Sequence, residues 1–298
     1  MSTYASPATA SAIDEGRTTM TTITADAVQR NKRRTVSRPS ALRTLAQRRF
    51  TLTARTPREL LVPLVTPILF AVVIAPALKT ALHAPAAYES FVAVGTIGLL
   101  IPLNTMFSGI GVIVDRDTGA RPELLAAPVS RSLLVVANLL VALLVTGLQV
   151  LALIAAALLR GISFDTSASG LAWTIAAAAL FGVGMYGVAE TLANRIRRQE
   201  EYIARLPVVA IVPWFLAGSL FPITALPQGL TYLAKVFPLT HALALMRYGL
   251  LNDPSALSNI WGMSDATEMA ALSLAVVTLF AVALTLISIR VFRHTAVH

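Results

Sequence analysis

Cysteine is absent from the 298-residue sequence, and only 13% of the residues are charged. Without cysteine, the chain has no disulfide, thiolate metal site or thiol nucleophile. So few charges, together with 56% hydrophobic residues, indicate an integral membrane protein rather than a soluble domain. The net charge of +9 would suit nucleic acid. The basic residues, however, lie beside apolar runs without interleaved aromatic residues, which favours lipid headgroups.

Charge is also absent from stretches long enough to cross a bilayer, which takes about 20 apolar residues. Ser90–Val114 and Ser132–Leu159 contain 25 and 28 residues without a charge, and Leu60–Leu78 contains 19. We therefore predict an all-α integral membrane protein whose six-span domain covers residues 40–294. Its transmembrane helices are expected at residues 60–78, 90–114, 132–159, 167–189, 206–222 and 269–289, with kinks at the prolines of the first span.

The distribution of the 24 basic residues predicts the orientation of these spans. Six spans place both termini on one side. That side holds 20 Lys and Arg residues, against four on the other: Lys79, Arg160, Lys235 and Arg247. Because basic residues concentrate on the cytoplasmic side, both termini are expected in the cytoplasm. The chain is then a multi-pass protein of the bacterial cell (inner or plasma) membrane.

The N-terminal part of the chain precedes the first span. Residues 1–39 are rich in Thr, Ser and Ala, without apolar periodicity or a signal peptide, and are predicted to be a disordered cytoplasmic tail. The apolar and basic residues that follow fall roughly at helical spacing, which predicts an amphipathic helix lying on the inner leaflet. Its residues Arg43, Arg48 and Arg49 are expected to contact lipid phosphates. A basic anchor that only sets orientation is the alternative.

A charged segment, Val114–Arg131, separates the second span from the third. It contains three Arg, two Asp and one Glu between two uncharged runs, so it must lie in water at the membrane surface. Its position favours contact with a partner protein, and an ordinary solvated loop is the alternative. A second segment, residues 190–205, alternates in sign and is predicted to be a solvated helix, with contact to the same partner as the alternative.

Prolines interrupt the segment between the fifth and sixth spans. With Pro222, Pro227 and Pro238 in place, no apolar run is long enough to cross before Lys235 and Arg247. We therefore expect the helix to break at Pro222, to form a short amphipathic hairpin and to return near Pro238. This arrangement is a re-entrant element at the outer face. Such an element must be buried in protein or line a cavity. A seventh span is the alternative, and it would place the basic C-terminus outside.

The expected spans contain no Asp, Glu, Lys or Arg between their ends, whereas ion-driven transporters usually need ionisable groups at mid-membrane. The sequence also lacks a GxxxxGK[ST] phosphate loop. A pump of this kind would need an ATPase on another chain, and a passive scaffold fits the same absences. Gly182, Gly184 and Gly187 match a dinucleotide fingerprint in letters. They lie inside an apolar run, where small residues serve close helix packing.

Two segments carry a resemblance to a known family. The first opens with Asp115, Arg116, Asp117 and Gly119 and closes with Pro-Val-Ser-Arg at 128–131. The second contains, in order, Phe215, Gly218, Phe221, Pro222, Leu226, Pro227, Pro238, Thr240 and Arg247. With the six-span layout, they resemble the type-2 permeases of ATP-binding-cassette exporters over roughly residues 40–293, in the branch of drug, polyketide and nodulation-type lipo-oligosaccharide exporters. After the acidic opening, Gly-Ala-Arg-Pro-Glu replaces the family's Gly-Thr-Leu-Glu, which affects where the helix of this segment begins.

The resemblance implies a role for each segment. The loop between spans two and three would carry a coupling element that docks on an ATPase subunit, formed by Asp115, Arg116, Asp117, Gly119, Glu123, Pro128 and Arg131. The N-terminal helix would add to this contact. The re-entrant helices would close the exit of a pathway between two permease subunits, with an outer gate of Phe221, Pro222, Leu226, Pro227 and Pro238.

The chain is therefore expected to be the permease subunit of an ATP-driven exporter that moves an amphipathic small molecule or lipid-like product. It would pair with a second permease copy, identical or related, and with ATPase subunits that hold ATP and Mg²⁺. No cofactor and no catalytic residue are expected in this chain. A membrane-embedded enzyme is one rival, but Ser108 and His241, which would suit a protease, are expected at opposite membrane faces. A passive membrane scaffold is the other rival.

Overall fold

The computed structural model describes residues 38–85, 87–120 and 130–295, and within these ranges the chain forms helices and no strands. The all-α prediction is confirmed for this part of the chain. The long helices are α5 (Tyr88–Asp117), α7 (Arg131–Leu159), α8 (Ala168–Arg195), α9 (Gln199–Leu216) and α13 (Ala266–Thr295). The shorter elements are α2 (Arg38–Ala54), α3 (Pro57–Leu69), the π-helical turn η1 (Phe70–Ile74), α4 (Ala75–Ala81), the 3-10 turn η2 (Ile223–Ala225), α10 (Gln228–Val236), α11 (Pro238–Leu251) and α12 (Ser255–Trp261). The predicted tail, residues 1–39, lies outside the described residues except for the first two residues of α2.

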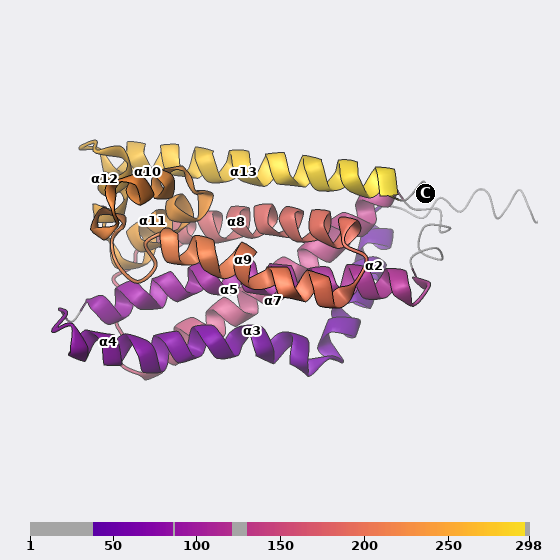
Figure 1. Cartoon of the computed structure of the whole chain (residues 1–298), viewed down its shortest axis with the longest axis horizontal. Helices are drawn as coiled ribbons and strands as arrows, with labels where there is room; N and C mark the ends of the chain where they lie inside the picture. Colours follow the sequence, from indigo (N-terminus) through magenta and orange to yellow (C-terminus); the bar gives the residue numbers. More distant parts are fainter. Residues whose placement is uncertain (1–37, 86, 121–129, 296–298) are drawn as a thin grey trace, which may run out of the picture.

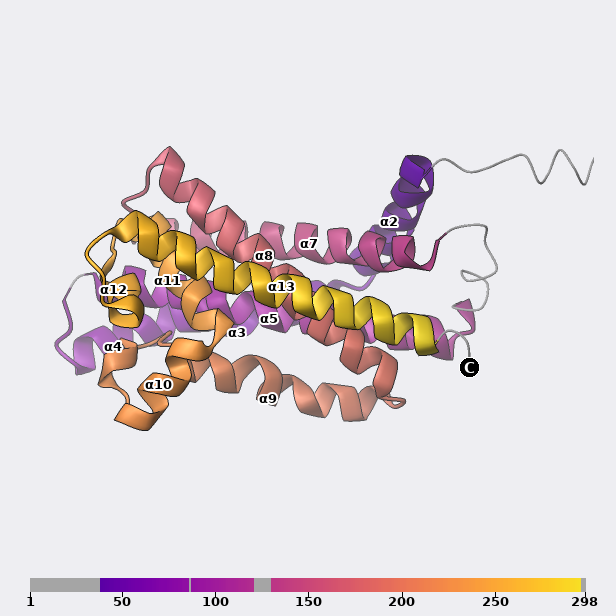
Figure 2. The ribbon, with the colours of Figure 1, turned by 90° about the horizontal axis from the view of Figure 1, so that it is seen from above.

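The long helices run along a common axis, and the two ends of the bundle differ (Figure 1). α2 and the last turn of α13 lie at one end, here called the α2 end. α10, α11 and α12 gather at the other end, the α12 end. Seen from above, α7 and α9 cover opposite faces, with α5 and α13 between them (Figure 2). Both ends of the described chain therefore lie at the same end of the bundle.

Five stretches of the described chain are long and apolar enough to span a membrane: Leu64–Ala81, Tyr88–Asp117, Ser132–Leu159, Ala168–Arg195 and Ala266–Phe292. The protein is thus multi-pass. In the first of these spans, where kinks were predicted, the helix widens into the π-helical turn η1 between Pro67 and Pro76. Because proline cannot donate the helical hydrogen bond, such a local change of helix pitch is expected near prolines.

The predicted fifth span, residues 206–222, differs from the structure. Helix α9 begins earlier and ends at Leu216, because Gly218 adopts a positive φ of 79° and Pro222 cannot continue a helix. α9 does run from the α2 end to the α12 end (Figure 1). Its first two turns carry Glu200, Glu201 and Arg205, however, and it is not among the five apolar spans. The count of six spans therefore remains a prediction.

α5 is the central helix and is buried along most of its length. Its glycines allow close approach, since a Cβ on Gly98 would lie 2.6 Å from a methyl group of Leu243 in α11. α8 packs against α13 in the same way: a Cβ on Gly187 would lie 2.7 Å from the backbone carbon of Leu284, and one on Gly184 would strike Phe280. The glycines of residues 182–187 thus serve helix packing.

α10 and α11 form a helical hairpin that turns at Phe237. α10 is largely exposed, whereas α11 is buried among α5, α8 and α13. Two successive helices thus lie where the re-entrant hairpin was predicted, and the second of them lies inside the protein. Backbone that enters a membrane without crossing it is tolerated in such a setting. Whether this hairpin enters the membrane remains a prediction.

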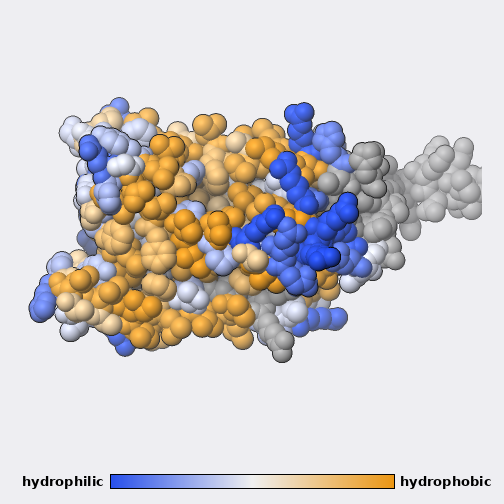
Figure 3. All heavy atoms as spheres, viewed as in Figure 1, coloured by the Kyte–Doolittle hydropathy of each residue, from blue (hydrophilic) through white to orange (hydrophobic). Residues whose placement is uncertain are grey.

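Apolar side chains cover the flank of the bundle, and hydrophilic ones lie at both ends, with the strongest cluster at the α2 end (Figure 3). The exposed apolar residues come from several spans and include Leu61, Val65 and Leu69 of α3, Leu144, Leu148 and Leu151 of α7, and Leu279 and Leu286 of α13. A soluble protein rarely exposes so much contiguous apolar surface. This flank therefore fits contact with lipid or with another membrane subunit.

The contact of Gly187 with α13 predicts a sharp difference between two glycines. Gly187→Ala should lower the free energy of unfolding by about 1–3 kcal/mol, because the added Cβ meets backbone atoms that cannot move aside. Gly147→Ala in α7 is the matched control, since a Cβ there meets nothing within 4 Å. We expect this control to retain or improve stability. Thermal unfolding of the two purified variants in detergent tests the prediction, and equal midpoints would contradict it.

Candidate functional site

The segment predicted to contact an ATPase begins in the last turn of α5, at the α2 end. There Arg48 of α2 donates a hydrogen bond to Asp115, with 3.0 Å between Nη2 and Oδ1. Arg49 Nη1 lies 4.0 Å from the other oxygen of the same carboxylate. One carboxylate thus joins two arginines of α2 to the end of α5. Asp115 therefore has partners within the chain, although it was predicted to be part of a surface that contacts another protein.

Arg49 inserts into the bundle. Its side chain donates a hydrogen bond of 2.9 Å to the carbonyl oxygen of Ser108, and its guanidinium fills the space that a Cβ on Gly111 would need. Arg49 is only 6% exposed. This corrects the expectation that Arg49 faces lipid phosphates, because its partners lie inside the protein. Arg43 on the same helix is exposed and has the position expected of a lipid-facing residue.

α9 and α8 hold the same part of α5 from other sides. The hydroxyl of Tyr202 in α9 donates a hydrogen bond of 2.7 Å to the carbonyl oxygen of Met106, and it occupies the space beside Gly109. Arg116 donates to three carbonyl oxygens at the end of α8, those of Ala193, Ile196 and Arg197, at 2.8–3.2 Å. A cation is favourable there because the C-terminus of a helix carries partial negative charge. Arg116 therefore caps α8.

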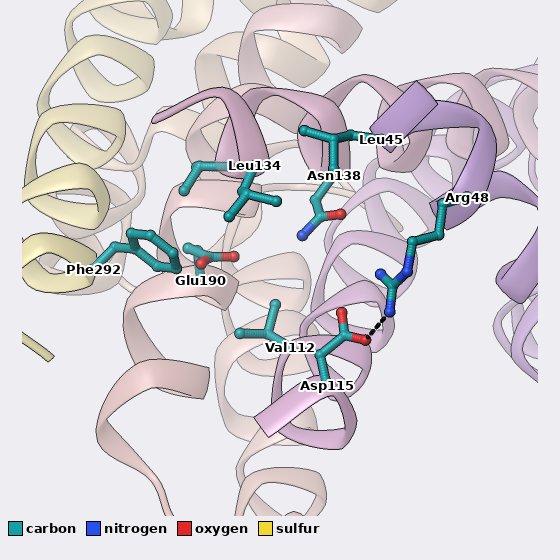
Figure 4. A pocket seen from close by; sticks show the side chains of 9 residues that line it. Leu45, Arg48, Val112, Asp115, Leu134, Asn138, Glu190 and Phe292 are labelled. Atoms are coloured by element: carbon teal, nitrogen blue, oxygen red, sulfur yellow. Dashed lines mark hydrogen bonds and ion pairs between the residues drawn. The ribbon is translucent and has the colours of Figure 1, made fainter. Parts of the chain in front are cut away.

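A small cavity of about 40 Å³ lies behind these contacts, where α2, α5, α7, α8 and α13 meet (Figure 4). Its labelled walls include Arg48, Asp115, Asn138, Glu190 and Phe292. The cavity is too small for an amphipathic substrate, since ligand pockets usually measure about 300–1,000 Å³. It is a polar junction between helices.

Glu190 is the most buried acidic residue of this junction. It is 1% exposed, although it was predicted to belong to a solvated helix of residues 190–205. The hydroxyl of Tyr186 donates to Glu190 Oε2 at 2.9 Å, and the amide of Asn194 donates to Oε1 at 3.0 Å. The correction has a simple cause: α8 continues to Arg195, so Glu190 lies within the packed helix.

The other predicted coupling residues lie further along the connection. Asp117 ends α5 with its side chain 56% exposed. Gly119 adopts a positive φ of 77°, and this turns the chain away from the helix. Glu123 and Pro128 lie outside the described residues, and Arg131 is the first residue of α7. The roles of these residues in contacting another protein remain predictions.

At the α12 end, a buried arginine holds the turn that follows α9. Arg247 of α11 donates to the carbonyl oxygens of Gly218 and Ser219 at 2.8 and 3.1 Å, and its guanidinium carbon lies 3.5 Å from the ring centroid of Phe91. The indole of Trp214 donates to the carbonyl oxygen of Gly95 in α5 at 2.7 Å. The turn is thus joined to α11 and, through α9, to α5.

The predicted outer-gate residues flank this turn. Phe221 is 37% exposed, Pro222 and Pro227 are exposed, and Leu226 and Pro238 are half-buried. They begin or end the short elements η2, α10 and α11. Their place at one end of the bundle suits a gate, although the gating role itself remains a prediction.

A wide cleft of about 690 Å³ also opens at the α12 end. Its charged residues are Lys79, Glu89, Arg160, Asp165 and Asp253. Lys79 and Glu89 form an ion pair of 2.7 Å. Because two basic and three acidic residues line the cleft, it has no strong electrostatic potential of either sign that would attract a charged ligand.

Sequence reasoning missed Arg49, Glu190 and Arg247 as buried polar residues. Arg247 had been counted as a basic residue of the outer side, although it is 3% exposed. A signal was present for one of the three, since Arg247 ends the second motif. For Arg49, the only feature of the sequence that relates to its burial is the pair of glycines at positions 109 and 111 of α5. In the structure, those glycines allow Tyr202 and Arg49 to pack closely against α5.

The helical bundle, its apolar flank and its polar ends define a multi-pass membrane protein. The family model of the ABC-2 type transporter matches residues 40–251, which is 212 of the 298 residues. The chain therefore belongs to the ABC-2 type transporter family. Its members are membrane permease components of ABC transporters, and they normally work with separate ATPase subunits. A comparison with curated proteins found no significant match.

The buried position of Arg49 predicts that two arginines of one helix differ in effect. Arg49→Ala should lower the free energy of unfolding by about 1.5–3 kcal/mol, because a hydrogen bond from a charged buried group is lost. Arg43→Ala, which removes an exposed arginine, should leave stability nearly unchanged. Thermal unfolding in detergent measures both, and trypsin should cut within α2 faster only in Arg49→Ala. Equal behaviour of the two variants would contradict the buried role of Arg49.

The hydrogen bonds of Arg247 predict that it keeps the turn after α9 closed. Since the chain has no cysteine, Ser219→Cys gives a single reporter at a position that is 0% exposed. Labelling by a membrane-impermeant maleimide should be slow in this variant. Adding Arg247→Gln should make labelling about tenfold or more faster, because roughly 1.4 kcal/mol of the free energy that keeps the turn closed is lost. Arg160→Gln, an exposed arginine at the same end, serves as control. Equal labelling rates in both backgrounds would exclude the holding role.

Proposed function

We propose that the chain is a six-span permease subunit of an ATP-driven exporter in a bacterial inner membrane. α9 supplies the sixth crossing, and both termini lie in the cytoplasm. The observation that carries this proposal is the construction of the α2 end. There the connection of residues 114–131 follows a helix, α5, that is bound to α2 through Asp115, to α8 through Arg116 and to α9 through the carbonyl oxygen of Met106.

The orientation follows from where the cations gather. Exposed arginines of α2, α8 and α9 and of the link between the last two lie at the α2 end, including Arg43, Arg195, Arg197, Arg198 and Arg205. Figure 3 shows a strongly hydrophilic cluster at this end, beside weaker hydrophilic patches at the α12 end. Because loops rich in Lys and Arg stay in the cytoplasm, the α2 end is the cytoplasmic end. The α12 end, with its hairpin and turn, is then the outer end.

Transmission begins at the cytoplasmic connection. ATP and Mg²⁺ bind to the partner ATPase, which moves when it binds and hydrolyses ATP, and residues 114–131 follow that movement. Arg49, Tyr202 and Arg116 prevent α5 from moving alone, because each joins it to another helix. At its other end, α5 lies against the turn that Arg247 holds. A displacement of the α5–α9 pair would therefore act on the outer-gate residues, from Phe221 to Pro238.

The substrate pathway requires a second subunit. Within one chain the helices are close-packed around α5, the junction cavity measures only about 40 Å³, and the cleft of about 690 Å³ is lined by residues of the α12 end. The apolar flanks of α3, α7 and α13 remain exposed, which suits lipid on some faces and a second permease copy on another. A pathway between two such apolar subunits would carry an amphipathic small molecule or a lipid-like product, as in the drug, polyketide and nodulation-type branch.

The test is nucleotide-driven transport by the chain reconstituted with its candidate ATPase in liposomes. Replacing Asp117, Glu123 and Arg131 by Ala should reduce stimulated ATPase activity and efflux by about tenfold or more, with assembly intact, since roughly 1.4 kcal/mol of lost coupling corresponds to a factor of ten. These three residues are preferred over Asp115 and Arg116, which hold the helices together.

A triple variant of equal charge type at the outer end, with Ala at Arg160, Asp165 and Asp253, is the matched control and should retain coupling. Unchanged turnover and efflux in the Asp117, Glu123 and Arg131 variant would exclude the coupling role of residues 114–131. If no ATPase associates with the chain, the exporter proposal gives way to a passive membrane scaffold.

A further inference from the structure

A second cavity, of about 30 Å³, lies beneath the turn at the α12 end. Its polar lining comes from Thr240 and Arg247 of α11 and from Ser255 and Asn259 of α12, and its apolar lining includes Phe91 and Pro222. Thr240 and Arg247 are seven residues apart, so they face the same side of their helix. The cavity thus joins α11, α12, α5 and the segment predicted to form the outer gate.

The polar groups of this cavity are incompletely satisfied. Arg247 Nε and Thr240 Oγ1 are buried and have no hydrogen-bond partner within the described part of the chain. Both residues are 3% exposed. Since nearly all buried polar atoms in proteins are hydrogen-bonded to protein or ordered solvent, two unpartnered donors on residues that line one cavity indicate that something occupies it.

The charge of Arg247 indicates what that occupant is. A buried guanidinium is costly unless an opposite charge compensates it. No Asp or Glu of the described residues lies within 4.0 Å of Arg247. The carboxylate of Asp253 attracts Arg247 electrostatically from beyond 4.0 Å, but its oxygens accept hydrogen bonds from the backbone and hydroxyl of Ser255. Two carbonyl oxygens and the ring of Phe91 stabilise the cation in part, but they carry no full negative charge.

We propose that the cavity binds a single halide-sized anion, such as chloride, between Arg247 and Thr240. Arg247 Nε and the hydroxyl of Thr240 donate to it, and the amide of Asn259 is within the same lining. The space is sufficient for one such ion, since a water molecule needs roughly 10–15 Å³. Pro222 and Ser255 are exposed at the rim, so the ion enters from the α12 end. The site does not depend on the exporter function.

The anion would act as a counter-ion in direct contact with Arg247, the residue that holds the turn after α9. Occupancy neutralises Arg247 and links α11 to α12 beside Pro222. The ion therefore stabilises the folded chain in proportion to its occupancy.

The test is the thermal unfolding midpoint of the purified full-length chain in detergent, at constant ionic strength, as sodium chloride or bromide replaces sodium gluconate. The midpoint should rise saturably with chloride or bromide by about 2–4 °C, the shift typical of a modest gain in stability for a domain of this size. Gluconate is too large for the cavity and should have no such effect.

Three variants locate the effect. Arg247→Gln and Thr240→Val should abolish the halide-dependent rise, and Thr240→Val removes only one hydroxyl, so it decides the matter if Arg247→Gln fails to fold. Arg160→Gln, an exposed arginine at the same end, should keep the full rise. A rise that persists in Thr240→Val, or equal midpoints in chloride and gluconate for the unaltered chain, would overturn the proposal and leave only water in the cavity. Crystals grown in bromide provide a direct check, because an anomalous peak beside Arg247 is expected, and its absence would also overturn the site.

Discussion

The backbone of α5 supplies the acceptors on which the packing of its neighbours depends. A buried donor must find a partner, and in an apolar bundle few side chains accept hydrogen bonds. Trp214, Tyr202 and Arg49 instead donate to carbonyl oxygens of α5, at Gly95, Met106 and Ser108, over 2.7–2.9 Å. Tyr202 and Arg49 reach their carbonyls because Gly109 and Gly111 leave room for them beside the helix, and Gly95 leaves room for the backbone of Ser219.

This arrangement divides the bundle into parts that differ in attachment. α9 is bound to α5 near both of its ends, through Tyr202 and Trp214, so the two helices form one mechanical unit. α2 and the end of α8 are joined to the same unit through Arg49 and Arg116. α13 is attached separately, to α11 and α12, because Ser273 accepts a hydrogen bond of 2.8 Å from the indole of Trp261 and lies 3.2 Å from His241 Nδ1. Polar contacts thus link the α2 end of α5 to the turn after α9.

Much of the fold was predictable because lipid imposes simple demands. Uncharged runs such as Ser90–Val114 must be helices, since a membrane offers no other partner for their backbone, and the structure has α5 there. The hairpin after Pro222 was likewise predictable from its prolines. The limits of α9 were not, because its end depends on the backbone of Gly218. The site was predictable only in part: Asp115 and Arg116 lie at the expected connection, but their partners come from α2 and α8.

The sequence alone determined the class of protein, the approximate positions of its apolar helices and the side on which charge gathers. These properties follow from the lengths of apolar runs and from counts of charged residues, which need no knowledge of contacts. Only the tertiary structure decided which charges are buried. Arg49 meets Ser108 across 59 positions of sequence, and Arg247 meets Gly218 across 29. Burying a charge is costly until such partners are assembled, and no local pattern around Arg49 or Glu190 shows that folding will supply them.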